Sequence, residues 1–340
     1  MTYRGMRSRR LEAALETELK NQTGQAGAAP SEAGLFAPAD FDHTQAERGG
    51  YSNYSYWGAT VRTFFKNRAA VFFLCLIAAV LLFTYIQPLL PNQKSPKTIY
   101  NDPTTGVQII NQAPSAEFWF GTNSIGQDLW ARTWAGTRTS LGIGFAVACF
   151  EALFGTTVGV LWGYVRKLDL AFTELYNIFD NVPQTLVLIL ISYILRPGVG
   201  TIVFALCLTG WLDMARFIRN QVVIIRDRDY NLASRCLGTT TPRIVLKNLL
   251  PYLVSVITLR MALAIPSAIG NEVFVTYIGI GLPTDTPSLG NLVQAGRLLM
   301  SQPNLRYQLL FPTAVLAVIT ISLYVVGNAF ADAADPKNHV

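Results

Sequence analysis

The chain has 340 residues, of which 51% are apolar and only 14% are charged, and its formal net charge is +6. This composition is too apolar for a water-soluble protein of this length and indicates residence in a membrane. The basic residues are scattered at the ends of hydrophobic runs and form no stripe. They therefore favour a role in membrane topology and argue against a nucleic-acid partner.

Residues 1–58 are polar and show no periodic apolar pattern apart from a short helix-like stretch at 9–20. We expect a disordered cytoplasmic tail here, because a segment with so few apolar residues has little to bury. Aromatic residues such as Trp57 then precede Arg62 and Lys66. Aromatic and basic residues together predict an interfacial helix on the cytoplasmic side, with a solubilising flank as the alternative.

Six hydrophobic runs are each long enough to cross a bilayer, whose hydrocarbon core needs roughly 20 apolar residues per helix. The predicted spans cover residues 69–90, 140–164, 170–195, 201–217, 252–280 and 309–330. The interfacial helix and first span make up residues 59–90, and the other five spans lie within a core of residues 139–332. Basic flanks place residues 91–138 outside the cell, and both termini, including the short tail 333–340, inside.

The extracytoplasmic segment and the second span carry local packing signals. Ser124 or Asn123 is positioned to cap a short helix that carries Leu129, Trp130 and Trp134 as an aromatic belt. In the second span, glycines recur every four residues at Gly155, Gly159 and Gly163. This GxxxG spacing predicts close packing of the span against a neighbouring helix.

A polar stretch at residues 226–251, between the fourth and fifth spans, has the local signals of two short helices. Asp229 suits a helix N-terminus, and Gly238 lets the chain turn. Thr241 is placed to cap the second helix, with Pro242 at its first position, where the missing N–H costs nothing. The dense basic residues around this stretch predict that it is cytoplasmic.

The same stretch has an apolar side that includes Leu232, Ala233 and Leu237. Its arginines would also attract anionic lipid, so adsorption to the membrane surface is an alternative. The two helices are too short for stable adsorption, and the Gly–Thr–Pro break specifies a shape that lipid binding does not need. We therefore interpret the stretch as a docking surface for another protein.

No pattern of catalytic residues occurs in the sequence. There is no GxxxxGK[ST] nucleotide-binding loop, and both histidines, His43 and His339, lie in the terminal tails. The cysteines show no CxxC spacing, so neither a disulfide framework nor a zinc site is predicted. They are Cys75, Cys149, Cys207 and Cys236. If ATP drives this protein, another chain must supply the ATPase.

Three ionisable residues, Asp180, Arg260 and Glu272, lie within hydrophobic runs. Each costs about 2.5–3.5 kcal/mol on insertion scales and so needs a reason to be there. They either line a water-filled path or hold a movable helix interface, or they pair across helices or lie near the headgroups.

Kinks are predicted near two of these residues. Pro183 permits a kink in the third span. Pro266 and Gly270 are expected to break the fifth span just before Asn271 and Glu272, which would free backbone groups for polar partners. Glu272 is accordingly the strongest candidate for a structural or gating contact, although such kinks also serve as packing devices.

The cytoplasmic stretch resembles a family motif of the permease subunits of binding-protein-dependent ABC importers. The family pattern is Tyr-x-Glu-Ala-Ala-x-x-x-Gly followed by an apolar-Pro pair, and here it runs from Tyr230 to Gly238 and then to Pro251. Leu232 replaces the family's Glu and Ser234 replaces its second Ala. The spacing is preserved, but the salt bridge that the Glu would make to the ATPase is placed in doubt.

Further segments resemble the branch of this family that serves di- and oligopeptides, nickel and related solutes. They are Phe120-Gly121-Thr122 with Gly126 and Asp128, Glu272 with Tyr277-Ile-Gly-Ile-Gly281, Pro287-Ser-Leu-Gly290, and Asp332-Ala-Ala-Asp335-Pro336. The resemblance covers residues 118–336, and the loop looks most like oligopeptide permeases of the C-subunit type.

The resemblance implies an all-helical type I importer permease in the bacterial inner membrane, with six transmembrane helices and a coupling helix in a cytoplasmic loop, residues 219–251, between the fourth and fifth spans. It implies a B-type permease, two cytoplasmic ATPases that bind ATP and magnesium, and an extracytoplasmic peptide-binding protein as partners. This chain itself would bind no cofactor or metal and would not be an enzyme. The implied coupling residues are Tyr230, Leu232, Ala233, Ser234, Gly238, Pro242, Arg243 and Pro251. Candidates for the translocation path or its gate are Asp180, Pro183, Arg260, Asn271 and Glu272.

Three alternatives remain from the sequence. A permease of the same family could import nickel or another small solute. A self-sufficient secondary transporter is a second alternative, but it usually shows internal repeats of spans, and no convincing repeat is present. A membrane scaffold without transport activity is the third.

Overall fold

The computed structural model describes residues 56–334, so the predictions for the tails 1–55 and 335–340 lie outside it. Helices dominate this part of the chain, accompanied by isolated β-bridges. The helices are α3 (Tyr56–Lys66), α4 (Arg68–Ile86), α5 (Leu129–Phe150), α6 (Thr156–Tyr164), α7 (Arg166–Asp180), α8 (Gln184–Ile194), α9 (Val199–Arg226), α10 (Asp229–Cys236), α11 (Thr241–Ile244), α12 (Leu250–Tyr277), α13 (Leu289–Leu298) and α14 (Tyr307–Ala334). Two π-helical turns, Glu151–Gly155 and Val245–Leu249, and two 3₁₀ turns, Gln87–Leu89 and Pro303–Leu305, complete them.

Within the described residues, five helical stretches are long and apolar enough to cross a membrane: α4, α5 with α6, α9, α12 and α14. The pair of α7 and α8 makes a sixth if it counts as one span, and it bends by 76° at its break. Pro183 lies at this break and donates no backbone N–H, which is why the helix is interrupted where the kink was predicted. The all-helical membrane class is confirmed, and the count of six spans depends on this bent pair.

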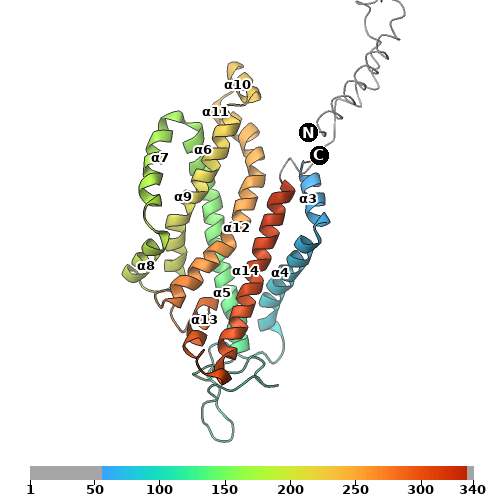
Figure 1. The fold of residues 1–340 in the computed structure, drawn as a ribbon, viewed down its shortest axis with the longest axis vertical. Helices are drawn as coiled ribbons and strands as arrows, with labels where there is room; N and C mark the ends of the chain where they lie inside the picture. The colour runs from blue at the N-terminus through green and yellow to red at the C-terminus, as the bar shows by residue number, and fades with distance from the viewer. Residues whose placement is uncertain (1–55, 335–340) are drawn as a thin grey trace, which may run out of the picture. The chain divides into compact units, whose positions relative to one another are not determined.

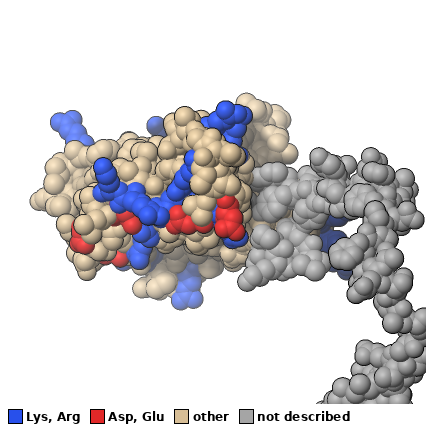
Figure 2. All heavy atoms as spheres, turned by 90° about the horizontal axis from the view of Figure 1, so that it is seen from above, with Lys and Arg blue, Asp and Glu red and all other residues tan. Residues whose placement is uncertain are grey.

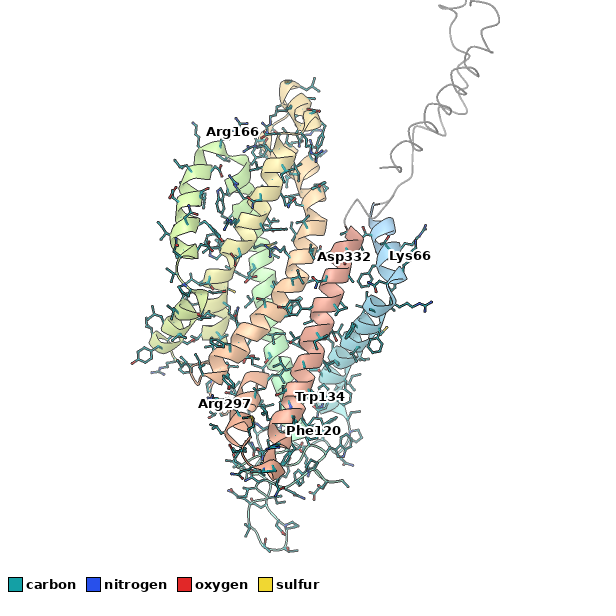
Figure 3. All side chains as sticks on the ribbon, in the orientation of Figure 1. Lys66, Phe120, Trp134, Arg166, Arg297 and Asp332 are labelled. Carbon is teal, nitrogen blue, oxygen red and sulfur yellow. The ribbon has the colours of Figure 1, made fainter. Side chains whose placement is uncertain are left out.

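The long helices run alongside one another, and α10 and α13 lie at opposite ends of the bundle (Figure 1). We call these the α10 end and the α13 end. Figure 3 shows Arg166, Lys66 and Asp332 toward the α10 end and Phe120 and Arg297 toward the α13 end. The N-terminus of α4 and the C-terminus of α14 therefore lie toward the same end, as an even number of crossings requires.

The second and fourth spans approach closely because glycines replace larger side chains along α6 and the turn before it. A Cβ added to Gly159 would lie 2.5 Å from the Ala215 carbonyl oxygen and 2.8 Å from the Ile218 Cβ. A Cβ added to Gly155 or Gly163 would come similarly close to atoms of α9. Small residues let helix backbones approach in lipid and gain dispersion contacts, so the packing predicted from the GxxxG spacing is confirmed.

The second span begins earlier than predicted, because α5 runs from Leu129 directly into the bundle. Asp128 caps it, and its Oδ2 accepts a hydrogen bond from the N–H of Ala131 at 2.9 Å. The separate short helix capped by Ser124 or Asn123 is therefore a wrong prediction. The Asn123 side chain instead accepts backbone N–H groups inside the turn that precedes the helix.

The second short helix of the polar stretch also differs from its prediction. Its N-cap is Thr240, so Thr241 and Pro242 occupy the first two helical positions and the predicted cap is wrong by one residue. The helix then continues through the π-helical turn Val245–Leu249 into α12. Pro251 has no N–H to donate, and the wider turn before it accommodates the missing bond.

The fifth span is one helix, α12, with Pro266 in its interior. The break predicted at Pro266 and Gly270, just before Glu272, is therefore wrong. Helices α5 and α14 pack along α12. In a membrane, neighbouring helices of this kind allow a proline to be tolerated without ending the helix.

Candidate functional site

A compact knob, residues 227–240, joins α9 to α11 at the α10 end (Figure 1). It is shorter than the loop predicted at 219–251, because α9 extends to Arg226 and α11 continues into α12. Gly238 follows α10 with a φ of +78°, a left-handed conformation that glycine adopts without strain. The knob therefore has a defined turn at the position predicted for it.

The knob presents apolar side chains to its surroundings. Tyr230, Leu232 and Leu237 are 50%, 43% and 86% exposed, and Leu246 on the following turn is 63% exposed. Lys and Arg side chains gather on this end of the molecule and alternate with acidic ones (Figure 2). Exposed apolar side chains at an end that also carries charged ones have the composition of a protein-docking surface.

The other predicted loop residues divide between the knob and its base. Ala233 is exposed beside Leu232, and the Ser234 Oγ donates to the Tyr230 carbonyl oxygen at 2.8 Å. Pro242 and Arg243 are exposed at the start of α11. Pro251 lies beyond the knob, in the first turn of α12.

A buried asparagine fixes the knob to the helices on both sides. The Asn231 Nδ2 donates to the Ile225 carbonyl oxygen at 2.9 Å, at the end of α9. Its Oδ1 accepts from the Asn248 Nδ2 at 2.9 Å, on the turn that leads into α12. Because the nitrogen and the oxygen of the Asn231 side-chain amide each bind a neighbouring element, α10 is tied to the fourth and fifth spans.

Two arginines connect the knob to the second span as well. The Arg226 Nη1 donates to the Gly163 carbonyl oxygen at 2.6 Å near the end of α6. The Arg235 guanidinium lies 5.2 Å from the centre of the Tyr164 ring and donates to the Arg226 carbonyl oxygen at 3.2 Å. The knob is thus anchored on three spans, which is one more than its chain connections provide.

Ion pairs surround the base of the knob. Asp227 pairs with Arg226 at 3.2 Å and with Arg166 at 3.6 Å. The hydrogen-bonded Arg226 side chain, helped by the charge of Arg166, holds the pKa of Asp227 below its ordinary value. Asp169 at the start of α7 similarly binds Arg219 of α9 at 2.8 Å.

A polar cavity of about 260 Å³ lies inside the bundle, between α5, α8, α9, α12 and α14. Its polar side chains come from segments far apart in the sequence. They are Glu151, Gln184, Asp213, Arg260 and Asn271. The structure therefore brings the predicted path residues Arg260 and Asn271 together in one place.

A second cavity, of about 160 Å³, adjoins the first at the break between α7 and α8 and shares Gln184 and Asp213 with it. Asp180 and Pro183 line this second cavity. The Tyr176 hydroxyl donates to Asp180 at 2.8 Å, so the third span contributes a hydrogen-bonded carboxylate. The two cavities thus lie next to each other along α9.

Glu272 is separate from both cavities and fully buried. Its carboxylate accepts from the Ser140 Oγ at 2.8 Å and from the Thr276 Oγ1 at 3.2 Å. The Ser140 oxygen also accepts the N–H of Leu289 at 3.2 Å, in the first turn of α13. Glu272 therefore joins α5, α12 and α13, and α13 itself is a helix between the predicted fifth and sixth spans.

Sequence reasoning did not single out Glu151, Gln184 or Asp213 as path candidates. Glu151 did carry a signal, because it is an ionisable residue inside the run predicted as the second span. Asp213 lies near the basic end of the predicted fourth span, where a charge is expected of a membrane flank. Gln184 is neutral, and the sequence does not distinguish it from other polar residues of a span.

Comparisons with known proteins give a consistent result. Residues 155–340 match the model of the binding-protein-dependent transport system inner membrane component, and residues 55–114 match the N-terminal transmembrane domain of oligopeptide transport permease C. The oligopeptide transport system permease protein AmiD of Streptococcus pneumoniae is 37% identical, with 84% of this chain and 91% of that protein covered. The oligopeptide transport system permease protein OppC of Bacillus subtilis is 32% identical, with 89% and 97% covered.

The dipeptide transport system permease protein DppC of Bacillus subtilis is 34% identical, with 76% of this chain and 80% of that protein covered. Among solved structures, a chain of the inward-facing MetNI methionine ABC transporter is 20% identical with a TM-score of 0.49, and 62% of this chain and 96% of that chain are covered. From its family model and its curated relatives, this chain belongs to the binding-protein-dependent transport system inner membrane components, as a C-type permease subunit of an ABC importer.

Proposed function

We propose that this chain forms half of the transmembrane path of an ATP-driven importer of oligopeptides. A related B-type permease would supply the other half, two cytoplasmic ATPases would hydrolyse ATP with magnesium, and an extracytoplasmic binding protein would deliver the peptide. The chain would contribute no catalytic residue and no cofactor site. The names of its relatives, which are permeases for oligopeptides and dipeptides, favour peptides over nickel as the solute.

The observation that carries the coupling part of this proposal is the knob itself. Its exposed Leu232 and Leu237 offer an apolar contact to an ATPase, and Gly238 allows the turn between the two short helices. Asn231 and Arg226 bind it to the spans on which it stands. A rigid element of this kind can transmit a movement of the ATPase to α6, α9 and α12 as a unit.

Sidedness follows from the charges. Lys and Arg side chains are visible on the α10 end (Figure 2), and such residues favour the cytoplasmic side of a membrane. We therefore assign the knob and both chain termini to the cytoplasm. The segment between α4 and α5 is assigned to the extracytoplasmic side, where the binding protein would dock.

The docking test replaces Leu237 with aspartate in the importer purified through a tag on this chain. We expect the amount of co-purified ATPase to fall about tenfold or more, because a charge would be placed in an apolar contact. Binding of the ATPase to the wild type should change little between about 0.1 and about 0.5 M salt. Leu232 replaces the family's Glu, so this position forms no ion pair that salt could screen.

The matched control is Leu298→Asp, because Leu298 is 72% exposed at the α13 end, away from the knob. This variant should retain its ATPase. Unchanged co-purification of the ATPase with Leu237→Asp would refute docking at the knob. Peptide uptake that continues without ATP would instead support a secondary transporter and overturn the proposed function.

A further inference from the structure

The carboxylate of Glu151 is positioned by a local irregularity of the second span. The π-helical turn Glu151–Gly155 begins at this residue and separates α5 from α6. Turns of this type widen a helix and change the direction of a side chain, and they are frequent at functional sites. On the opposite helix, Gly210 leaves room for the Glu151 carboxylate in this position, since a Cβ there would overlap it.

Glu151 has no partner of its own in the described part of the chain. Among residues 56–334, its carboxylate makes no hydrogen bond and no ion pair within 4 Å, although it lines the cavity of about 260 Å³. Arg260 lines the same cavity, but its guanidinium lies over the Phe217 ring, 4.1 Å from the ring centre. Asp213 accepts only a long hydrogen bond of 3.4 Å from the Tyr176 hydroxyl.

The cavity therefore has an excess of negative charge. The lining residues that carry a formal charge are two carboxylates, Glu151 and the exposed Asp213, and one guanidinium, that of Arg260. An unpaired carboxylate inside a membrane is costly, so the site favours a cation that can enter and leave. Gln184 and Asn271 add neutral side chains that can accept further hydrogen bonds.

The residues fit an ammonium group better than a metal ion. In the part of the chain that the structure describes, no three His, Cys, Asp or Glu side chains converge on one point. A desolvated divalent metal ion needs more oxygen ligands than two carboxylates supply, whereas an ammonium group has only three N–H donors to satisfy. The volume is also several times the ~30 Å³ that one water molecule occupies in the liquid.

We propose that Glu151 and Asp213 bind the positively charged amino terminus of a peptide during its passage through this cavity. The proposal rests on peptides being the solute and adds a binding position to that function. Arg260, held on Phe217, would lower the affinity of the acidic pair for cations, so that the peptide is released again. Conduction requires such binding to be weak enough for the solute to leave.

The test measures binding of trialanine and N-acetyl-trialanine to the purified importer by equilibrium dialysis, without the extracytoplasmic binding protein. Wild-type importer should bind trialanine about tenfold more tightly, because acetylation removes the charge that the carboxylates recognise. Glu151→Gln should bind both peptides equally weakly, and Glu151→Asp should restore part of the preference. The matched control is Glu174→Gln, an exposed carboxylate of α7 that lines neither cavity, which should keep the full preference.

Three outcomes would overturn the proposal. They are equal affinity of the wild type for the two peptides, an undiminished preference of Glu151→Gln for trialanine, or a loss of affinity in that variant that is equal for both peptides. Uptake of trialanine into proteoliposomes with the binding protein and ATP is measured in parallel with the wild type. If uptake occurs and the preference is absent, only the ammonium site is wrong. If no peptide is taken up, the proposed function itself fails.

Discussion

Buried charges have two uses in this protein, and the difference lies in their partners. The Arg132 guanidinium is buried and donates to the carbonyl oxygens of Pro96 at 3.3 Å and Thr284 at 3.1 Å. Glu272 is likewise satisfied by hydroxyl groups. Each holds together segments that are distant in the chain, as buried hydrogen-bonded charges can. Glu151, which is unpaired and faces a cavity, has a different environment.

Asp128 provides a prediction at the residue scale. Burial raises the pKa of this carboxyl, and nearby Lys94 opposes the shift only in part. A raised pKa means that the folded chain binds the proton more tightly than the unfolded chain. Its contribution to stability is thus largest below the unfolded pKa of about 3.9 and is lost as the pH rises through the folded value.

Asp128→Asn should keep the helix cap, since Asn and Asp cap equally well, and should remove the buried charge. We expect its melting temperature in detergent at pH 7 to exceed that of the wild type by about 2–4 °C, which corresponds to about 1 kcal/mol. The difference should shrink as the pH falls toward 4. A lower melting temperature for the variant at pH 7 would show that Asp128 is better stabilised as an anion than burial implies.

At the scale of elements, two π-helical turns set how the spans meet. The turn Glu151–Gly155 lies where the second span contacts α9, and Val245–Leu249 lies just before Pro251. Each allows a helix to continue while its side chains change direction. The close contact of α6 and α9 then depends on the glycines that follow the first turn.

A pair of glycine substitutions tests this contact. Gly159→Leu should reduce the yield of folded protein or lower its stability by about 1–3 kcal/mol, because its side chain would meet the backbone of α9. Gly142→Leu is the matched control within the same span, since a Cβ there meets nothing within 4 Å. Monodisperse yield and thermal unfolding in detergent compare the two. Equal losses would mean that the glycines serve something other than helix packing.

At the scale of the whole molecule, the proposed sidedness links the knob, the cavities and the outer segment in one direction of transport. The knob lies at the α10 end, and the two adjoining cavities are lined by residues of α9 and its neighbouring helices. The segment between α4 and α5 lies toward the α13 end, where Figure 3 shows Phe120. A solute that enters at the α13 end would pass the cavities before it reaches the end with the knob.

Cys236 offers a direct test of this orientation, because it is an exposed cysteine of the natural sequence at the end of α10. A membrane-impermeant maleimide should label it in inverted membrane vesicles and leave it unlabelled in intact cells. Cys236→Ser identifies the label that belongs to this residue, since Cys75 is also exposed. Labelling that is lost with the serine variant and occurs in intact cells would reverse the assigned sidedness.

Much of the architecture follows from local sequence. Runs of apolar residues predict spans because hydrocarbon thickness fixes their length. Pro183 marks the break between α7 and α8, and Gly238 marks the turn of the knob, because each residue restricts or permits backbone angles by itself. The break predicted at Pro266 failed because neighbouring helices decide whether a proline ends a helix in a membrane, and the cap predicted at Thr241 was wrong by one residue.

The sequence by itself determined the class of protein, the positions of most spans and the turn of the knob at Gly238, since these depend on composition and on residues close together in the chain. Only the tertiary structure decided which polar residues share a space. Glu151, Asp213 and Arg260 come from three different spans, whereas Glu272 is enclosed by α5 and α13. Their roles differ because solvation and partners inside a membrane depend on contacts between distant segments.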